Sequence, residues 1–179
     1  MNIVVNTSFT QFELAKFAEI TAKYGYNDQR KRSKTLSIIL VILCLIPSFS
    51  FIVFQDYELL IFPVFIGIIS TVSVKRFYSK ALPKSIVEAN KVECPAKITC
   101  AFYNDYYYYK KEHTMVVGEA SIRYEHLSRV VETPDFFLLL DKRKSGVLVP
   151  KRDMEHNDII ALSTYLSAKC LSVYKYVAK

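Results

Sequence analysis

The side chains best suited to binding or chemistry form a run of four tyrosines followed by two lysines. The run consists of Tyr106, Tyr107, Tyr108, Tyr109, Lys110 and Lys111. Because side chains alternate along a strand, neighbouring tyrosines are expected on opposite faces, so that at least one pair points outward beside a lysine. Tyrosine combines a large apolar ring with a hydroxyl group. The run therefore predicts a surface for a peptide, a partner protein or a lipid headgroup, although tyrosines also suit strands for packing alone.

A second group of cations lies on a predicted hairpin tip and comprises Lys142, Arg143 and Lys144. Lys151 and Arg152 follow the next predicted strand. Charges at a turn are commonly just solvated, and the sharper hypothesis is a contact with anionic lipid headgroups. Each such cation contributes about 1 kcal/mol near an acidic surface. We expect the hairpin tip to form the stronger half of that contact.

No set of residues has the spacing of a catalytic or metal centre. The three histidines, His113, His126 and His156, fall on different predicted elements. Ser121, His126 and Asp135 contain the side chains of a triad, but they lack a nucleophile elbow, and there is no glycine-rich phosphate loop. The four cysteines form no CxxC pair. We predict a protein that is not an enzyme, with no catalytic residues, no metal and no cofactor.

The charge of the chain favours an anionic partner. The formal net charge is +7, with +3 in residues 1–34 and +6 in residues 75–179. Nucleic acid is the competing partner of a basic surface, but no nucleic-acid-binding motif accompanies the charge, so none is predicted.

Two apolar runs without a charged residue, Leu36–Phe54 and Leu59–Val74, predict a hairpin of two transmembrane helices at 36–54 and 57–74. Only Asp56 and Glu58 are charged in the connecting turn, whereas lysines and arginines flank both outer ends. Basic flanks stay in the cytoplasm. We therefore expect a multi-pass protein of the inner or plasma membrane, with both termini cytoplasmic and the lipid bilayer as an integral partner.

The remainder predicts cytoplasmic elements in three parts. Residues 1–34 suggest a strand and an amphipathic helix, with Thr10 and Glu13 as its capping box and Phe12 on its apolar face. Residues 77–95, after the hairpin segment 35–76, predict a juxtamembrane linker helix.

Residues 96–179 alternate between apolar and polar positions and then change to a helical period. Strands are expected at 96–102, 106–112, 114–124, 128–132, 135–141 and 146–151. A helix capped by Asp153 should follow, with one apolar stripe of Ile159, Leu162, Leu166, Cys170, Val173 and Val177. The fold class is thus an α+β membrane protein: a transmembrane hairpin plus an antiparallel β-sheet or partial barrel closed by a C-terminal helix. Whether the N-terminal strand joins this sheet stays open.

The strand segments carry a family resemblance. Residues 124–127, 130–132, 135–140 and 147–151 resemble the C-terminal domain of the YcxB-like bacterial membrane proteins, and the layout of the whole chain is similar. The resemblance implies a fold similar to bacterial pleckstrin-homology-like domains. It brings no catalytic residues with it.

The sequence leaves three hypotheses for the function open. The first is a non-enzymatic, membrane-anchored binding or regulatory module at the cytoplasmic face. The second is a small membrane-associated enzyme that uses a tyrosine or histidine of the β domain. The third is an accessory subunit of a transporter or channel.

Overall fold

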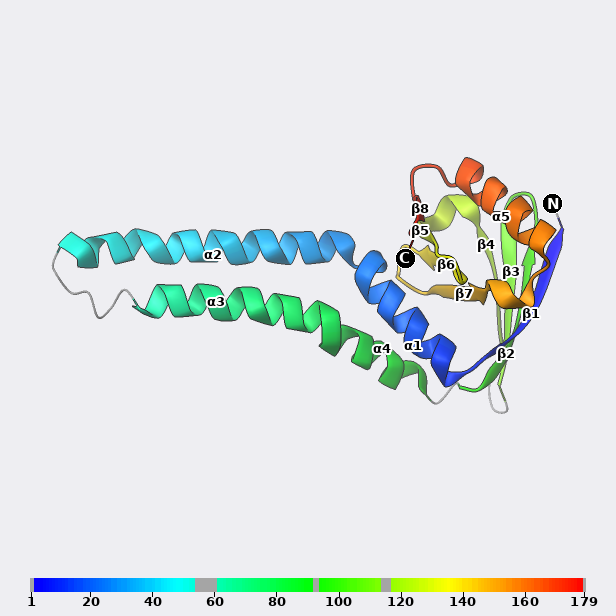
Figure 1. Ribbon diagram of the computed structural model, residues 1–179, viewed down its shortest axis with the longest axis horizontal. Coiled ribbons are helices and arrows are strands. Elements are labelled where there is room, and N and C mark those ends of the chain that lie inside the picture. The colour runs from blue at the N-terminus through cyan, green and yellow to red at the C-terminus, as the bar shows by residue number, and fades with distance from the viewer. Residues whose placement is uncertain (1, 54–60, 92–93, 114–116, 179) are drawn as a thin grey trace.

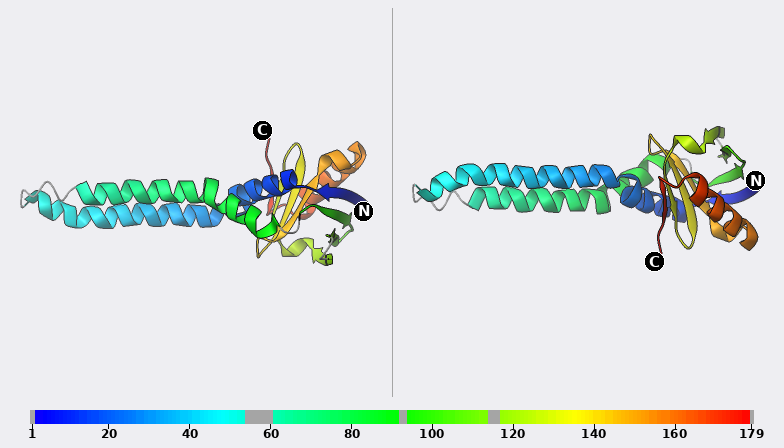
Figure 2. Two further views of the ribbon diagram at one scale, coloured as in Figure 1. Left: turned by 90° about the horizontal axis from the view of Figure 1, so that it is seen from below. Right: turned by 90° about the horizontal axis from the view of Figure 1, so that it is seen from above.

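The computed structural model describes residues 2–53, 61–91, 94–113 and 117–178. Within these residues, a head built of two β-sheets carries a long helical hairpin that projects from one side (Figures 1 and 2). The hairpin consists of α2 (Asn27–Val53) and α3 (Ile61–Arg76), which lie side by side in all three views. The predicted turn around Asp56 and Glu58 lies outside the described residues.

The transmembrane character predicted for this hairpin is wrong. In the part of the chain that the structure describes, no helix is both long enough and apolar enough to cross a bilayer. The multi-pass membrane location and the cytoplasmic termini, which depended on these spans, are overturned with them.

The two hairpin helices approach closely where Gly67 faces Val41. A Cβ atom on Gly67 would lie 2.8 Å from Val41 Cγ2, so the missing side chain permits this contact. Apolar side chains elsewhere on the hairpin, such as Ile38, Leu43 and Ile68, are largely exposed.

The first sheet contains four antiparallel strands in the order β1-β2-β3-β4. They are β1 (Ile3–Phe9), β2 (Ala96–Phe102), β3 (Tyr106–Glu112) and β4 (Val117–Arg123). Burial alternates along β1, with Val5 inside and Val4 54% exposed, as its sequence pattern predicted. Ile3 pairs with Phe102, so the N-terminal strand does join the C-terminal strands.

The second sheet is mixed and has the order β7-β6-β5-β8. It contains β5 (Leu127–Glu132), β6 (Phe136–Asp141), β7 (Gly146–Pro150) and the short β8 (Tyr174–Tyr176), which runs parallel to β5. The chain leaves the first sheet through the turn η5 (Tyr124–His126), and β5 then pairs with β6 instead of β4. The fold is α+β, but the predicted single sheet or partial barrel is wrong.

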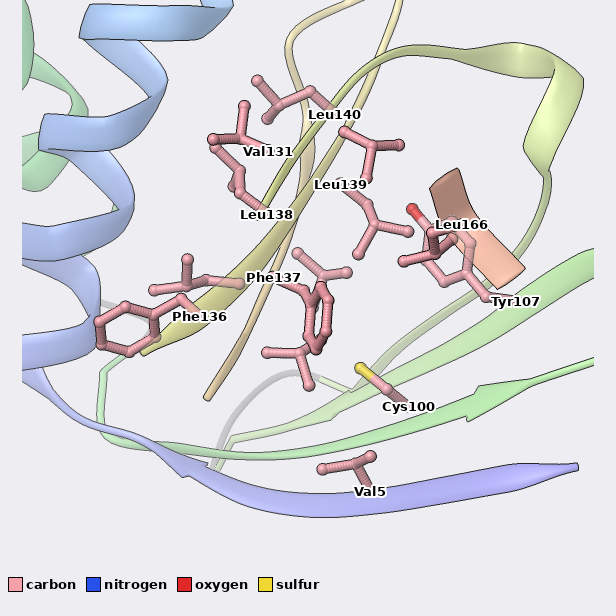
Figure 3. Close-up of a cluster of buried hydrophobic side chains, with 14 of the residues drawn as sticks. Val5, Cys100, Tyr107, Val131, Phe136, Phe137, Leu138, Leu139, Leu140 and Leu166 are labelled. Carbon is pink, nitrogen blue, oxygen red and sulfur yellow. The ribbon is translucent and has the colours of Figure 1, made fainter. Parts of the chain in front are cut away.

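The central strand β6 explains why two layers form. Its first five residues are all buried, so other elements must pack against both of its faces. Figure 3 shows Phe137 and Leu139 pointing toward Cys100 and Tyr107 of the first sheet, with Leu138 on the opposite side, toward the helices. A strand whose side chains alternated between core and solvent would need another layer packed against one face only.

Helix α1 (Gln11–Ile20) begins at the predicted capping box. The Thr10 amide donates to Glu13 Oε2 at 2.9 Å, and the Phe12 amide donates to Thr10 Oγ1 at 3.3 Å. The predicted apolar face was wrong in one position, because Phe12 is 57% exposed while Leu14 is buried.

Two π-helical turns lie where the hairpin meets the head. The turn η1 (Thr21–Gly25) follows α1, and η3 (Phe77–Ala81) leads from α3 into α4 (Leu82–Asn90). The two turns contact each other, and α4 packs on α1. The predicted linker helix is therefore part of the head. Such turns are uncommon within helices and are frequent at functional sites.

The C-terminal helix α5 (His156–Lys169) packs Leu162 and Leu166 into the core, as its stripe predicted. Glu155 occupies the N-cap position in place of Asp153, which belongs to the turn η6 (Lys151–Asp153) and accepts a hydrogen bond from Thr7 Oγ1. The helix ends at Lys169, so Val173 and Val177 do not lie on it, and the chain continues into β8.

Candidate ligand-binding cavity

A cavity of about 750 Å³ lies among the first sheet, the β6–β7 hairpin and helices α1 and α4. This volume falls within the range of pockets that hold small molecules, about 300–1,000 Å³. Much of its lining is apolar and includes Phe9, Leu14, Phe17, Ile98, Ile122 and Leu148. The cavity thus depends on segments from both ends of the chain.

Two buried hydroxyl groups belong to the residues that line the cavity. Tyr107 is 0% exposed and Thr21 is 2% exposed. Neither hydroxyl has a hydrogen-bond partner among the described residues. Figure 3 shows the Tyr107 side chain rising from β3 toward the second sheet. Burial raises the pKa of Tyr107, so its hydroxyl stays protonated and able to donate.

The charged side chains that line the cavity are mainly cationic. Lys111 comes from β3, and Arg143 and Lys144 come from the turn between β6 and β7. His113 follows β3 and adds an imidazole. Asp141 is the one carboxylate among the described lining residues.

The carboxylate of Asp141 organises the turn that presents two of these cations. Its Oδ1 accepts the backbone amides of Arg143 at 2.8 Å and Ser145 at 2.9 Å. Lys144 adopts a left-handed conformation with φ 66°, which closes the turn. The main-chain conformation therefore holds Arg143 and Lys144 at the cavity.

Two glycines in the cavity wall differ in the space around them. A Cβ atom on Gly146 would come within 1.9 Å of the Leu139 carbonyl oxygen, so the backbones are in contact there. A Cβ atom on Gly118 would meet nothing within 4 Å. Position 118 therefore offers room for a larger side chain.

The structure divides the predicted tyrosine–lysine run between the two faces of β3. Tyr107, Tyr109 and Lys111 line the cavity. The outward residues make their own contacts: Tyr106 packs on Tyr103, Tyr108 donates to Glu119 at 2.7 Å, and Lys110 pairs with Glu112 at 2.6 Å.

The hairpin-tip cations and alternate residues of the tyrosine–lysine run meet at one site. Arg143 and Lys144 line the same cavity as Tyr107 and Lys111, whereas Lys142 is exposed and does not. The sequence singled out both groups but gave no reason to join them.

The second predicted pair of cations is engaged inside the head. Lys151 Nζ lies 2.6 Å from Glu132 Oε1 and sits over the Phe137 ring at 4.5 Å. Arg152 pairs with the buried Glu13 at 2.8 Å. Both side chains join elements of the head through these ion pairs. The two cations predicted for a headgroup contact therefore already have carboxylate partners.

The buried Glu132 carboxylate forms a closed cluster. It accepts hydrogen bonds from Lys151 Nζ at 2.6 Å, from Ser163 Oγ at 2.7 Å and from the Tyr174 hydroxyl. Burial alone would raise the pKa of Glu132, but these donors outweigh it and keep the pKa below its ordinary value. The cluster joins β5, the turn η6, α5 and β8.

The buried thiols are poorly suited to nucleophilic chemistry. Burial raises the pKa of Cys100 to about 12, which leaves almost no thiolate at neutral pH. Burial also raises the pKa of Cys170. Within the described part of the chain, no three histidine, cysteine or acidic side chains are placed to hold a metal ion.

Several cavity residues had not been recognised from the sequence. Thr21 lies in the π-helical turn η1, and Ile86 lies on α4, far along the chain from β3. Only one local signal was available: Gly118 interrupts a strand, where glycine often marks a bulge or a close approach.

Residues 116–166 match the family model described as YcxB-like protein. The matched segment contains β4, β5, β6 and β7 and extends into α5. No match was found among curated proteins, and none among solved structures. The likeness to pleckstrin-homology-like folds therefore stays a prediction.

Proposed function

Because residues 116–166 carry the YcxB-like family pattern and supply β4 and the β6–β7 hairpin of the cavity wall, we propose that this protein is a non-enzymatic ligand-binding module. The cavity between the sheets is its binding site. The matched segment alone does not enclose the site, since α1, α4 and β3 complete it.

One observation carries the proposal: an apolar cavity of about 750 Å³ lies between the sheets, and two residues of its wall have buried hydroxyls without a partner among the described residues. Most buried polar side-chain atoms in folded proteins have at least one hydrogen bond, and leaving one unpaired costs about 1–3 kcal/mol. Thr21 and Tyr107 both face this cost at the same cavity. A ligand whose acceptor atom enters the wall far enough to reach either hydroxyl would remove it.

A binding role also suits the titratable groups better than catalysis. A general base or nucleophile works best with a pKa near the operating pH. Burial instead raises the pKa of Tyr107, Tyr124 and Cys100 away from neutrality. His126 and His156 are exposed and do not line the cavity.

A test fills the cavity and measures the affinity of the full chain for an apolar fluorescent probe. Gly118→Leu places a side chain in the open space of the wall and should weaken binding at least about tenfold, equal to about 1.4 kcal/mol. Ser121→Leu is the matched control, because Ser121 is an exposed residue of the same strand outside the cavity lining.

Both variants should unfold at the temperature of the unmodified protein. Equal probe affinity in Gly118→Leu and the unmodified chain would contradict the proposal. So would an equal loss of affinity in the Ser121→Leu control.

A further inference from the structure

We infer that the ligand of this cavity is an amphipathic anion, with an apolar body and a carboxylate or phosphate head. This inference rests on the proposed function and specifies the chemistry of the ligand. It is carried by the charge distribution around the cavity, the apolar lining and the two unpartnered hydroxyls together.

The apolar part of the ligand follows from the walls. Phe17 and Leu14 of α1, Ile86 of α4 and Ile98 and Ile122 of the first sheet all line the cavity. Each apolar group of a ligand placed there leaves water, and the gain is about 25 cal/mol per Å². A small hydrophilic anion would forgo this contribution.

The acidic head follows from the balance of charges. Arg143 and Lys144 of the β6–β7 turn line the cavity together with Asp141, which is the one carboxylate among the described lining residues. Its Oδ1 already accepts two backbone amides of its own turn. The ion pairs formed among the described residues involve cations other than Arg143 and Lys144.

The two faces of β3 also differ in how their cations are balanced by carboxylates. On the outer face, Lys110 is paired with Glu112 at 2.6 Å, so the charge there is already balanced. The cavity face receives Arg143 and Lys144 from another element, and the described lining residues include no carboxylate besides Asp141. Bidentate pairing to a planar or tetrahedral anion is the interaction for which arginine is best suited.

The buried hydroxyls in the wall are further donors for an acceptor atom that reaches them. Tyr107 is a donor at neutral pH, because burial raises its pKa. Thr21 provides a second hydroxyl from the turn η1. A carboxylate or phosphate offers several acceptor lone pairs and can satisfy hydroxyls and cations at once.

The test compares ligands of one chain length that differ only in the head. Displacement of the apolar probe from the full chain is measured with dodecanoate, dodecyl phosphate, dodecanol and dodecylammonium, and with inorganic phosphate alone. Dodecanoate or dodecyl phosphate should bind at least about tenfold more tightly than dodecanol. Dodecylammonium and inorganic phosphate should displace little probe. The carboxylate and phosphate arms identify which anionic head the site prefers.

Matched variants locate the recognition of the head. The double change Arg143→Gln and Lys144→Gln should weaken dodecanoate about tenfold and leave dodecanol unchanged. Lys142→Gln is the control, because Lys142 belongs to the same turn but does not line the cavity. Tyr107→Phe should also weaken the anion more than the alcohol.

The outcomes separate this inference from the proposed function. If dodecanol and dodecanoate bind equally and Gly118→Leu weakens both, the cavity is a binding site but the anionic ligand is wrong. If Lys142→Gln causes the same loss as the double change, the effect is a general surface charge and the inference fails. If no dodecyl compound and no probe binds, the proposed function fails with it.

Discussion

Two groups of buried polar side chains in the same head differ in how their hydrogen bonds are satisfied. The Glu132 cluster is closed, since Lys151, Ser163 and Tyr174 all donate to one carboxylate. The cavity is open, since Thr21 and Tyr107 have hydroxyls without partners among the described residues. A closed cluster stabilises the fold that contains it, whereas an open one is available to a ligand.

The difference follows from which elements meet. Glu132 lies at the end of β5, where α5 and β8 bring donors from the C-terminal part of the chain to it. The cavity lies where α1 and α4, at the base of the hairpin, approach the two sheets. Helices packed across a gap between sheets leave volume that strands in register do not.

The largest expected effect breaks the closed cluster. Lys151→Met leaves the Glu132 carboxylate, whose side chain is 5% exposed, without its cation. Removing one partner of a buried ion pair costs about 3–5 kcal/mol, so the unfolding free energy in urea should fall by that amount. The double variant Glu132→Gln with Lys151→Met should recover much of the loss. A loss below about 1 kcal/mol would show that the cluster is not closed as described.

A pair of hydroxyl deletions should have opposite signs. Ser163→Ala removes a donor to the Glu132 carboxylate at 2.7 Å and should lower the unfolding free energy by about 1.5–2 kcal/mol. Thr21→Val removes a buried hydroxyl without a partner and should raise the unfolding free energy by about 1 kcal/mol when no ligand is bound. Urea denaturation of both variants gives the comparison. Destabilisation by Thr21→Val would mean that its hydroxyl is already satisfied.

On the acidic side, a dependence of stability on pH should follow from Glu132. Hydrogen bonds hold the pKa of Glu132 below 4.5, its ordinary value, and outweigh burial, which raises it. A group with a lowered folded pKa adds stability above its unfolded pKa, and this stability is lost as the pH falls through the folded value. The unfolding free energy should therefore decrease below about pH 4.5, and Glu132→Gln should reduce that decrease. The same slope in both proteins would exclude Glu132 as its cause, and Glu13, whose pKa is also lowered, would then be the next residue to change.

The smallest expected effect sharpens the description of the cavity turn. Lys144 has φ 66°, which glycine adopts at lower cost, so Lys144→Gly should raise the unfolding free energy by about 0.5–1 kcal/mol. The change also removes a cation from the cavity and should weaken dodecanoate. Lys142→Gly is the control, because Lys142 has no positive φ, and it should not stabilise the protein. Stabilisation by both changes would point to charge repulsion in the turn instead of backbone strain.

The local elements of the head could be predicted because their signals lie within a few residues. Thr10 and Glu13 form the capping box, and the alternation at Ile98, Cys100 and Phe102 marks a strand that the structure places at Ala96–Phe102. Both signals depend on hydrogen bonds and side-chain directions within one segment. The burial of Leu162 and Leu166 followed from helical spacing in the same way.

The errors concern partners that lie far away in the sequence. An uncharged apolar run predicted a transmembrane span, but in the part of the chain that the structure describes no helix is both long enough and apolar enough to cross a bilayer. Val173 continued the stripe of α5, but the chain turns at Cys170 and places Tyr174 beside Val130. Hydropathy and periodicity do not record where a helix starts or which strand is available for pairing.

For the candidate site, the types of residue were visible in the sequence and their association was not. Tyr107, Lys111, Arg143 and Lys144 all stood out as tyrosines or clustered cations. Only the tertiary structure turns alternate β3 side chains inward, brings the β6–β7 turn to them and adds Thr21 from a helix. The physical reason is that a residue's chemistry and local conformation are set by its neighbours in the chain, whereas a cavity is the volume left where separate elements pack against each other.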